Sequence, residues 1–449
     1  EGYGLNMPAI SGLAEKGADI LLTVDCGISD IEAVVHAKAL GLGVVITDHH
    51  LPGETLPPAD GLVNPRLSDC PCPALAGVGV AFFLAAAINA ALCKAGRTKM
   101  DIRSLLDLVA LGTLADVVDL NGQNRILVKN GLLKIAQAGR VGVAALKAAC
   151  NFSPTADLGA GQVVFTLAPR INAAGRLGSS AIALELLLTN DRQRAAELAA
   201  ELSRLNAERR EEEERILAEA MLEADAQVAK GMMGLVLYAA DWHPGIIGIV
   251  ASRVVERLHR PAVVLCSTGV FLKGSGRSVS GFNLHGAFQA CADLFLGFGG
   301  HKMAAGLSLA SERLAEFKVR FNALAANALG KSPSEAECRL DGELDFAQAD
   351  FHLLKELEML QPFGMGNAEP VFASPPVRVK NMRARPGFLM LELEDEEHRR
   401  TLCAKAWRQL ADMPAGLKGK RIRIAFTPRI DRYNGAATVE LRLKDWKES

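Results

Sequence analysis

The feature that most constrains the fold is a pair of apolar segments that each end in an acidic residue. Residues 20–24 lead into Asp25, and residues 43–47 lead into Asp48. Residues 29–40 between them have the length and composition of a crossover helix. A strand, a helix and a second strand form a βαβ unit, in which the two strands are parallel. We expect them to be neighbours, so that Asp25 and Asp48 lie at the C-terminal edge of the sheet, where open α/β folds build their sites.

Two histidines follow Asp48 and suggest a metal site. Taken alone, Asp48, His49 and His50 would fit a capped loop with two ordinary histidines, but Asp25 in register makes a functional site the better interpretation. Asp116 stands beside a further apolar segment. Carboxylates with imidazole suit Mn²⁺ or Mg²⁺ and leave positions for water and phosphate. Two such ions about 4 Å apart can cleave phosphodiesters, which needs roughly five or six ligands. The sequence offers at most four or five.

The composition is that of an ordinary soluble globular protein, with 49% hydrophobic and 22% charged residues among 449. A net charge of −1 excludes a global bias towards nucleic acid, so any such bias must be local. We find no apolar run of the roughly 18 residues that cross a bilayer and no signal peptide, and therefore expect no membrane partner. Nine cysteines without CxxC spacing favour a reducing compartment, and the cytoplasm is the expected location.

The order of the predicted elements divides the chain into four parts. Alternating strands and helices predict an α/β domain over residues 1–190, which looks incomplete at its N-terminus. Residues 191–230 have few helix breakers and many charges, as expected of a connecting helix. A second α/β pattern covers residues 231–332, and short alternating strands over residues 333–449 predict a small β-barrel. Residues 371–449 hold 17 Lys plus Arg against 10 Asp plus Glu, which is a local basic surplus.

Several segments carry more specific expectations. Ser29 is expected to cap the crossover helix. Residues 74–93 are apolar nearly all round and predict a buried helix. Residues 169–177 predict a loop that is broken by glycine and carries two arginines. Residues 274–278, with Arg277, combine flexible amides, hydroxyls and a guanidinium, the ingredients of a phosphate cradle, although a short Gly/Ser turn is the commoner explanation.

These motifs together resemble the DHH phosphoesterase superfamily with its second, DHHA1 domain. The motifs that carry the resemblance stand in the family's order: Val24-Asp25-Cys26-Gly27, Thr47-Asp48-His49-His50, Leu114-Ala115-Asp116-Val117-Val118, Asn172-Ala173-Ala174-Gly175-Arg176, Gly274-Ser275-Gly276-Arg277-Ser278 and Gly299-Gly300-His301. The long central helix and the basic, β-rich end make the chain look specifically like the RecJ family of bacterial 5′→3′ exonucleases for single-stranded DNA. The resemblance covers essentially the whole chain.

The resemblance implies roles for the residues of the first α/β domain. Asp25, His49 and Asp116 match family metal ligands, and Asp25 stands at the position that bridges two ions. The implied cofactor is Mn²⁺ or Mg²⁺ in a two-ion site. Asp48 and His50 match catalytic residues, which we expect to orient the ligand and contact the scissile phosphate.

The resemblance also implies substrate-binding residues. Ser275 and Arg277, with Arg176, match positions that hold the 5′-terminal phosphate, and His301 matches a substrate-side histidine. Without the resemblance, a salt-bridged Arg176 and a structural His301 are the commoner interpretations. The C-terminal barrel resembles the OB-like module that grips single strands.

The function implied by the resemblance is metal-dependent 5′→3′ exonuclease activity. The protein would be a hydrolase that degrades single-stranded DNA to nucleotides in DNA repair and recombination, with the strand in a groove between the two α/β domains. We expect single-stranded DNA as partner, a single-strand-binding protein and a helicase as further partners, and a monomer. Two alternatives stay open: a DHH phosphodiesterase for short oligonucleotides or cyclic dinucleotides, against which the basic C-terminal module argues, and a non-catalytic single-strand-binding scaffold.

The sequence departs from the family pattern in two places. The family begins with a strand whose Asp-x-Asp motif supplies further metal ligands, and nothing before Asp19 matches it. We therefore expect that the chain starts downstream of that strand, binds metal incompletely and cleaves DNA poorly. Asp119 stands where relatives often carry Pro, and we expect only a local effect on its loop.

Overall fold

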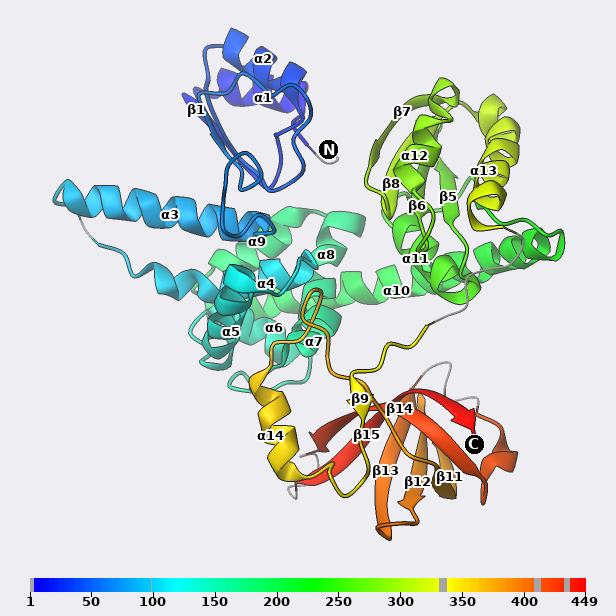
Figure 1. The fold of residues 1–449 in the computed structure, drawn as a ribbon. Coiled ribbons are helices and arrows are strands. Elements are labelled where there is room, and N and C mark those ends of the chain that lie inside the picture. Colours follow the sequence, from blue (N-terminus) through cyan, green and yellow to red (C-terminus); the bar gives the residue numbers. More distant parts are fainter. Residues whose placement is uncertain (1–3, 98, 331–336, 408–412, 432–436) are drawn as a thin grey trace. The chain divides into compact units, whose positions relative to one another are not determined.

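The computed structural model describes residues 4–97, 99–330, 337–407, 413–431 and 437–449. The chain forms two compact units (Figure 1). The first comprises Glu1–Ala168 with Cys338–Ser449, and the second comprises Pro169–Glu337. The domain boundaries expected from the sequence stay predictions.

The first unit begins with a parallel sheet, which helices follow. The elements are α1 Met7–Glu15, β1 Ile20–Val24, α2 Ile31–Ala39, β2 Gly43–Thr47, β3 Gly61–Val63, α3 Gly77–Lys94, η1 Ile102–Leu105, α4 Leu106–Ala115, α5 Gly122–Ala136, α6 Val141–Ala149, α7 Ala160–Gln162 and the π-helix η2 Val163–Leu167. The sheet has the order β1-β2-β3, and all pairings are parallel. The predicted βαβ unit with adjacent parallel strands is therefore confirmed.

Packing of α2 against β2 holds this sheet together. Val44 and Ile46 point to one face of β2 and are fully buried in a cluster with Val34 of α2. Burying an aliphatic side chain of this size contributes about 1.5–3 kcal/mol. The expected cap at Ser29 is wrong by one residue, because α2 begins after Asp30. The Asp30 carboxylate makes no capping bond and instead accepts a hydrogen bond from the amide of Leu5.

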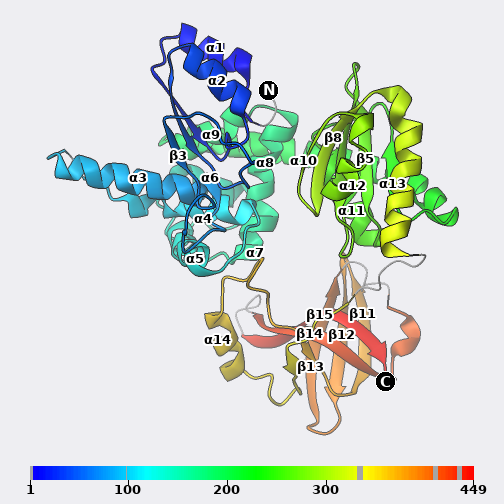
Figure 2. The same ribbon diagram turned by 45° about the horizontal axis from the view of Figure 1, so that its top comes forward.

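Helix α3 contradicts the expectation that residues 74–93 are buried. Only Gly77, Gly79 and Val80 are buried in it, whereas Phe83 is 41% exposed. The helix extends away from the neighbouring helices in both views (Figure 1, Figure 2). Within the described part of the chain, α3 is also long and apolar enough to cross a membrane, which corrects the expectation that no run reaches that length. Core helices and signal sequences meet the same criterion, so it assigns no membrane role.

The remainder of the first unit is a β-barrel, as predicted. Its elements are β9 Gly342–Glu343, α14 Phe351–Met359, β10 Phe372–Ala373, β11 Val377–Arg385, β12 Phe388–Asp395, β13 Arg400–Trp407, η6 Ala415–Leu417, β14 Arg421–Asp431 and β15 Thr438–Glu448. The strands follow the order β11-β12-β13-β15-β14-β10-β9, and β11 also pairs with β14, which closes the barrel. Along β12, Leu389, Leu391 and Leu393 point into the core, so the residues between them face outwards.

The second unit contains a long helix and a mixed sheet. Its elements are α8 Ala168–Leu177, α9 Ser180–Leu188, α10 Arg192–Ala229, β4 Leu235–Tyr238, α11 Ile247–Leu258, β5 Ala262–Ser267, β6 Leu272–Arg277, α12 Leu284–Gln289, η3 Ala292–Leu294, β7 Phe295–Gly300, β8 Ala304–Leu309, η4 Ser311–Arg313 and α13 Leu314–Leu329. The sheet order is β4-β5-β6-β8-β7, in which only β4 and β5 are parallel. The long helix expected over residues 191–230 is present as α10, with Asp191 as its N-cap.

Residues 169–177, expected to be a loop, belong to helix α8. Pro169 follows the π-helix η2 without a break, so it lies inside a continuous helical run, where its missing amide hydrogen removes one helical hydrogen bond. Gly175 lowers helix stability by only about 1 kcal/mol relative to alanine. Ala173 and Ala174 are fully buried, and this packing outweighs the weak helix propensity of the segment.

Candidate functional site

The two acidic residues predicted to meet at the sheet edge do so. Asp25 and Asp48 directly follow β1 and β2, and their amides donate hydrogen bonds to the carbonyl oxygens of Thr47 and Val63, at 2.9 and 3.0 Å. Asp25 has a left-handed backbone, with φ 66°. That conformation costs a non-glycine residue about 1 kcal/mol or more and is concentrated at functional sites. The strain at Asp25 therefore marks this edge as a candidate site.

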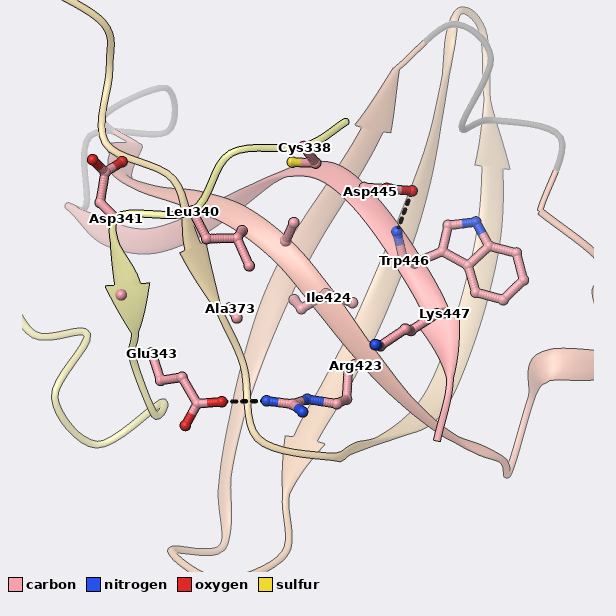
Figure 3. A pocket seen from close by; sticks show the side chains of 12 residues that line it. Cys338, Leu340, Asp341, Glu343, Ala373, Arg423, Ile424, Asp445, Trp446 and Lys447 are labelled. Carbon is pink, nitrogen blue, oxygen red and sulfur yellow. Dashed lines mark hydrogen bonds and ion pairs between the residues drawn. The ribbon is translucent and has the colours of Figure 1, made fainter. Parts of the chain in front are cut away.

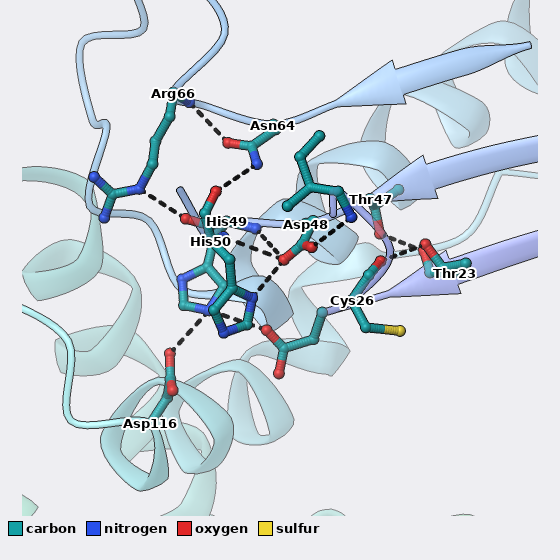
Figure 4. A network of polar contacts seen from close by, with 11 residues as sticks. Thr23, Cys26, Thr47, Asp48, His49, His50, Asn64, Arg66 and Asp116 are labelled. Carbon is teal, nitrogen blue, oxygen red and sulfur yellow. Dashed lines mark hydrogen bonds and ion pairs between the residues drawn. The ribbon is translucent and has the colours of Figure 1, made fainter. Parts of the chain in front are cut away.

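The three predicted metal ligands converge at this edge, and Figure 4 shows two of them, His49 and Asp116, directed towards each other. Nε2 of His49 lies 3.0 Å from Oδ1 of Asp25 and 3.5 Å from Oδ2 of Asp116. This nitrogen is buried, yet it makes no hydrogen bond of acceptable geometry to either oxygen. A buried ring nitrogen aimed at two carboxylates without a directed hydrogen bond suits a shared cation. The residues present therefore fit Mn²⁺ or Mg²⁺.

Charge in this cluster is incompletely balanced. Burial favours a neutral His49, but the neighbouring Asp25 and Asp116 carboxylates outweigh it and raise the pKa of His49. Burial, together with the Asp25 charge, raises the pKa of Asp116 despite the opposing effect of His49. The carboxylates thus repel each other, and a divalent cation would relieve that repulsion.

Asp48 and His50, the predicted catalytic pair, form a connected network. Asp48 is 1% exposed and accepts hydrogen bonds from the amides of Ile28, His49 and His50, at 3.1, 2.7 and 3.2 Å. It also lies 2.7 Å from Nδ1 of His50. These hydrogen bonds overcome the effect of burial and lower the pKa of Asp48. Asp48 therefore fixes the backbone of both histidines and the ring of His50.

His50 is the accessible member of that network, because half of its side chain is exposed. Donor atoms of Asp25, His49 and His50 all lie within 4.8 Å of one another. Since Nδ1 of His50 is engaged by Asp48, Nε2 is the atom available to a cation or a phosphate. The geometry is consistent with the predicted phosphate contact.

Two residues that sequence reasoning missed hold the histidine backbone. The side-chain amide of Asn64 donates to the carbonyl oxygen of His50, at 2.9 Å, and Nε of Arg66 donates to that of His49, at 2.8 Å. Both residues follow β3, the third parallel strand, at the same sheet edge. Their position after a parallel strand could have identified them from the sequence. However, β3 has only three residues, and its pattern is too short to recognise as a strand.

In the second unit, the predicted phosphate-binding residues come together around β6. Ser275 and Arg277 point to the same side of this strand, and Nη1 of Arg277 lies 3.1 Å from Oγ of Ser275. Gly248 lies in the first turn of α11, where an added Cβ would be 3.0 Å from Oγ of Ser275 and 3.3 Å from Nη2 of Arg277. The segment is therefore a strand and not a Gly/Ser turn, and it places a hydroxyl and a guanidinium beside a helix N-terminus.

Arg176 adds a second positive charge to this cluster. Burial, together with the charge of Arg176, lowers the pKa of Arg277. Nη1 of Arg176 donates to the carbonyl oxygen of Gly245, at 2.8 Å, and within the described residues no carboxylate pairs with it. The commoner interpretation, a salt-bridged Arg176, is therefore wrong. Two neighbouring guanidinium groups without a carboxylate favour an anion.

His301 lies in the turn between β7 and β8, and it is exposed. Its amide donates to the carbonyl oxygen of Ala304, at 2.7 Å, and Ala304 is opposite Arg277 in the β6–β8 register. His301 and Arg277 therefore share one end of the sheet, which is compatible with the predicted substrate-side role.

A cavity of about 600 Å³ opens on the C-terminal barrel (Figure 3). Its charged lining consists of Arg423 and Lys447 with Asp341, Glu343 and Asp445, and Glu343 forms an ion pair with Arg423. Carboxylates outnumber the cations, so this lining does not favour a phosphate. The cavity contains none of the residues predicted for the site.

The fold and the site define a metal-dependent phosphoesterase of the DHH type. Residues 5–113 match the model of the DHH family N-terminal domain, residues 231–327 match that of the DHHA1 domain, and residues 340–445 match that of the RecJ OB domain. The chain belongs to the RecJ family, whose curated members are described as single-stranded-DNA-specific exonucleases.

Individual relatives agree with this family. The chain is 44% identical to RecJ of Dickeya dadantii, with 83% of this chain and 67% of that protein covered. It is 38% identical to RecJ of Haemophilus influenzae, with 98% and 80% covered. The crystal structure of RecJ from Thermus thermophilus in complex with Mn²⁺ matches with a TM-score of 0.85 at 33% identity, over 99% of this chain and 64% of that one. A Mg²⁺ complex of RecJ from the same organism matches with a TM-score of 0.77 at 32% identity, over 98% and 64%. The chain thus spans about two thirds of several of its relatives.

Proposed function

We propose that the protein is a metal-dependent exonuclease that degrades single-stranded DNA from its 5′ end. The observation that carries this proposal is the convergence of Asp25, His49 and Asp116 around one buried, unbonded imidazole nitrogen. When bound there, Mn²⁺ or Mg²⁺ supplies Lewis-acid activation of water and charge neutralisation at the leaving oxygen. The family matches support single-stranded DNA as the substrate.

The residues at the first unit's site have three proposed roles: metal binding, positioning of the histidines and contact with the phosphate. Asp25, His49 and Asp116 would hold the metal. Asp48, which is buried, holds the imidazole of His50 and the backbone amides of both histidines by hydrogen bonds. His50 presents its exposed ring to the scissile phosphate, because its other nitrogen is already engaged.

Binding of the strand end is the proposed role of the second unit. Ser275, Arg277 and Arg176 offer a hydroxyl and two guanidinium groups, which suit the two charges of a terminal phosphate better than the single charge of an internal one. This difference would give the enzyme its preference for a 5′ end. His301 would contact the same end of the strand.

The outer face of the barrel offers a platform for the bases further along the strand. The rings of Phe388 and Trp407 lie 4.6 Å apart on neighbouring strands β12 and β13. Arg385 is opposite Phe388 on β11, and Nζ of Lys405, which forms an ion pair with Glu440 at 2.5 Å, lies 5.7 Å from the Phe388 ring. Exposed aromatic rings beside basic side chains bind unpaired bases by stacking. We name Phe388, Trp407, Lys405 and Arg385 the barrel platform.

The remaining expectations are carried forward as proposals. A cytoplasmic protein that acts in DNA repair and recombination, as a monomer and with a single-strand-binding protein and a helicase as partners, is consistent with the composition and the family. Incomplete metal binding and poor cleavage by this chain also stay predictions. They are tested by comparison with a longer chain that adds an upstream Asp-x-Asp strand.

The deciding experiment digests single strands labelled at the 5′ or the 3′ end, with Mn²⁺ or with EDTA. The longer chain, its Asp25→Ala variant and the chain of 449 residues are compared. We expect Mn²⁺-dependent release of 5′-terminal nucleotides by the longer chain and none by the variant. Release from the 3′ end would overturn the polarity, full activity of Asp25→Ala would overturn the metal site, and binding without any cleavage would favour a scaffold.

A further inference from the structure

We infer that the loop of residues 360–367, which leads into the barrel, positions the metal ligand Asp116. The inference rests on the proposed role of Asp116. The amide of Leu120, four residues after Asp116, donates a hydrogen bond to the carbonyl oxygen of Met365, at 2.6 Å. Two segments far apart in the sequence are therefore joined by their backbones beside the metal site. We name residues 360–367 the docking loop.

Two glycines allow this close approach. An added Cβ at Gly364 would lie 2.7 Å from Cδ1 of Leu120. At Gly366, with φ 69°, it would lie 3.0 Å from Cβ and Cγ of Asp119. The docking loop thus packs on Asp119 and Leu120 with no room for a side chain. Asp119, which stands where relatives often carry Pro, therefore lies at this contact.

The docking loop is held rigid from within and from α5. The side-chain amide of Asn367 donates to the carbonyl oxygens of Leu360 and Pro362, at 2.9 and 2.8 Å. Nη2 of Arg125 donates to the carbonyl oxygen of Leu360, at 3.0 Å. A braced loop can fix the position of what it contacts, whereas a mobile one cannot.

Asn124 extends the contact to the other side of the metal site. This fully buried residue donates to the carbonyl oxygens of Asp119 and Ala74, at 3.0 and 2.7 Å. Ala74 lies just before Gly77, the first residue of α3, and Gly77 packs against the Asp25 carboxylate. One side chain therefore ties the turn after Asp116 to the helix start that borders Asp25.

Val117 shows why the turn that follows Asp116 needs support from another segment. It follows Asp116 directly and has φ 58°, a left-handed conformation that is costly for a β-branched residue. Its side chain is 56% exposed, so local packing does not hold it. Docking of Leu120 and Asp119 on the docking loop supplies the missing restraint. The segment that carries the barrel is thereby also the segment that holds Asp116.

The test compares Gly366→Ala with Gly387→Ala. Both substitutions place alanine at a positive φ, of 69° and 83°, but a Cβ at Gly387 meets no atom within 4 Å. Hydrogen exchange over residues 113–121 is measured in the metal-free chain, and Mn²⁺ affinity is measured by electron paramagnetic resonance. In Gly366→Ala we expect faster exchange over these residues and Mn²⁺ affinity weakened about tenfold, as for loss of a ligand's supporting contact. Gly387→Ala should show the same exchange over residues 113–121 and the same Mn²⁺ affinity as the parent.

A second variant keeps the test decisive if Gly366→Ala unfolds. Asn367→Ala removes both hydrogen bonds that the Asn367 side chain makes within the loop, without adding a Cβ at the contact, and it should shift exchange and Mn²⁺ affinity in the same direction. Unchanged exchange over residues 113–121 in both variants, or an equal loss of Mn²⁺ affinity in Gly387→Ala, would overturn the inference. If the parent bound no Mn²⁺, which the expected incomplete metal site allows, the exchange comparison would still decide whether the loop holds Asp116, and digestion by the longer chain would separately decide the proposed function.

Discussion

The carboxylate of Asp25 lies directly against the backbone of Gly77. A Cβ added at Gly77 would be 2.2 Å from Oδ1 of Asp25 and 2.8 Å from its Cβ. The first residue of α3 therefore has to be glycine, because any side chain would occupy the place of the Asp25 carboxylate, a proposed metal ligand. This contact explains how an exposed apolar helix is connected to the site.

We predict that Gly77→Ala destroys the metal site while the domain stays folded. The methyl group can be accommodated only if Asp25 moves, and even loss of a group that merely supports a ligand weakens metal affinity by about 10- to 100-fold, so we expect a loss at least this large. Mn²⁺ affinity is measured by calorimetry. Gly12→Ala, in helix α1, is the matched control because its Cβ would meet no atom within 4 Å. Parental Mn²⁺ affinity in Gly77→Ala would show that Asp25 is not a ligand.

We predict that Arg277→Ala removes the preference for a phosphorylated 5′ end. Arg277 and Ser275 are part of a cluster with two positive charges and no opposing carboxylate among the described residues. Loss of one charge-assisted contact costs on the order of tenfold in affinity. Affinities for 5′-phosphorylated and 5′-hydroxyl strands are compared in the parent, in Arg277→Ala and in Arg277→Lys. The lysine variant should retain part of the preference. If Arg277→Ala left the ratio of the two affinities unchanged, the strand end would bind at another site.

Much of the first site could be predicted because parallel strands carry their ends to one edge. The register that sets Val24 opposite Thr47 brings Asp25 beside His49, and that register follows from the apolar runs alone. Contacts between distant segments could not be predicted in this way. Nothing local in the sequence indicates that Gly77 meets Asp25, or that Met365 meets Leu120.

The errors have a related physical cause. An apolar helix such as α3 is buried only if other elements cover it, and its own sequence does not say whether they do. Helix α8 contains proline and glycine, which indicate a loop, but tertiary burial of Ala173 and Ala174 overrides that local preference. The segment around Ser275 contains so much glycine that its pairing within a sheet, which is a long-range property, could not be recognised.

We predict that His398 stabilises the barrel in a pH-dependent way. Nδ1 of His398 lies 2.9 Å from Oδ2 of Asp395, and the hydrogen bond raises the pKa of His398 above its usual 6.5. Burial opposes ionisation of Asp395, but the hydrogen bonds that its carboxylate accepts from His398 and Glu397 outweigh that effect and lower the pKa of Asp395 below 3.8. The histidine's contribution is complete below pH 6.5 and is lost as pH rises through its folded pKa. The aspartate's contribution is present above pH 3.8 and is lost as pH falls through its folded pKa.

The stabilisation is therefore largest in mildly acidic solution. His398→Ala should lower the Tm of the barrel more at about pH 6 than at about pH 9, where the imidazole is neutral. Calorimetry at the two pH values measures the difference. His352→Ala is the control, because His352 is 82% exposed on α14 and lies 3.8 Å from Glu356. Equal Tm losses for His398→Ala at both pH values would show that the interaction between His398 and Asp395 makes no electrostatic contribution to stability.

We predict that Trp407→Ala weakens binding of single strands without affecting their cleavage chemistry. Trp407 is 43% exposed beside Phe388, so its removal exposes little of the core and should leave the barrel folded. Stacking of one base on an aromatic ring contributes about 1–3 kcal/mol, so the dissociation constant for oligothymidylate should rise about tenfold or more. Phe351→Ala removes a similarly exposed ring from α14 and should change nothing. Because stacking does not depend on charge, the loss in Trp407→Ala should persist at high salt, whereas a loss confined to low salt would mean that Lys405 and Arg385 bind only the phosphates.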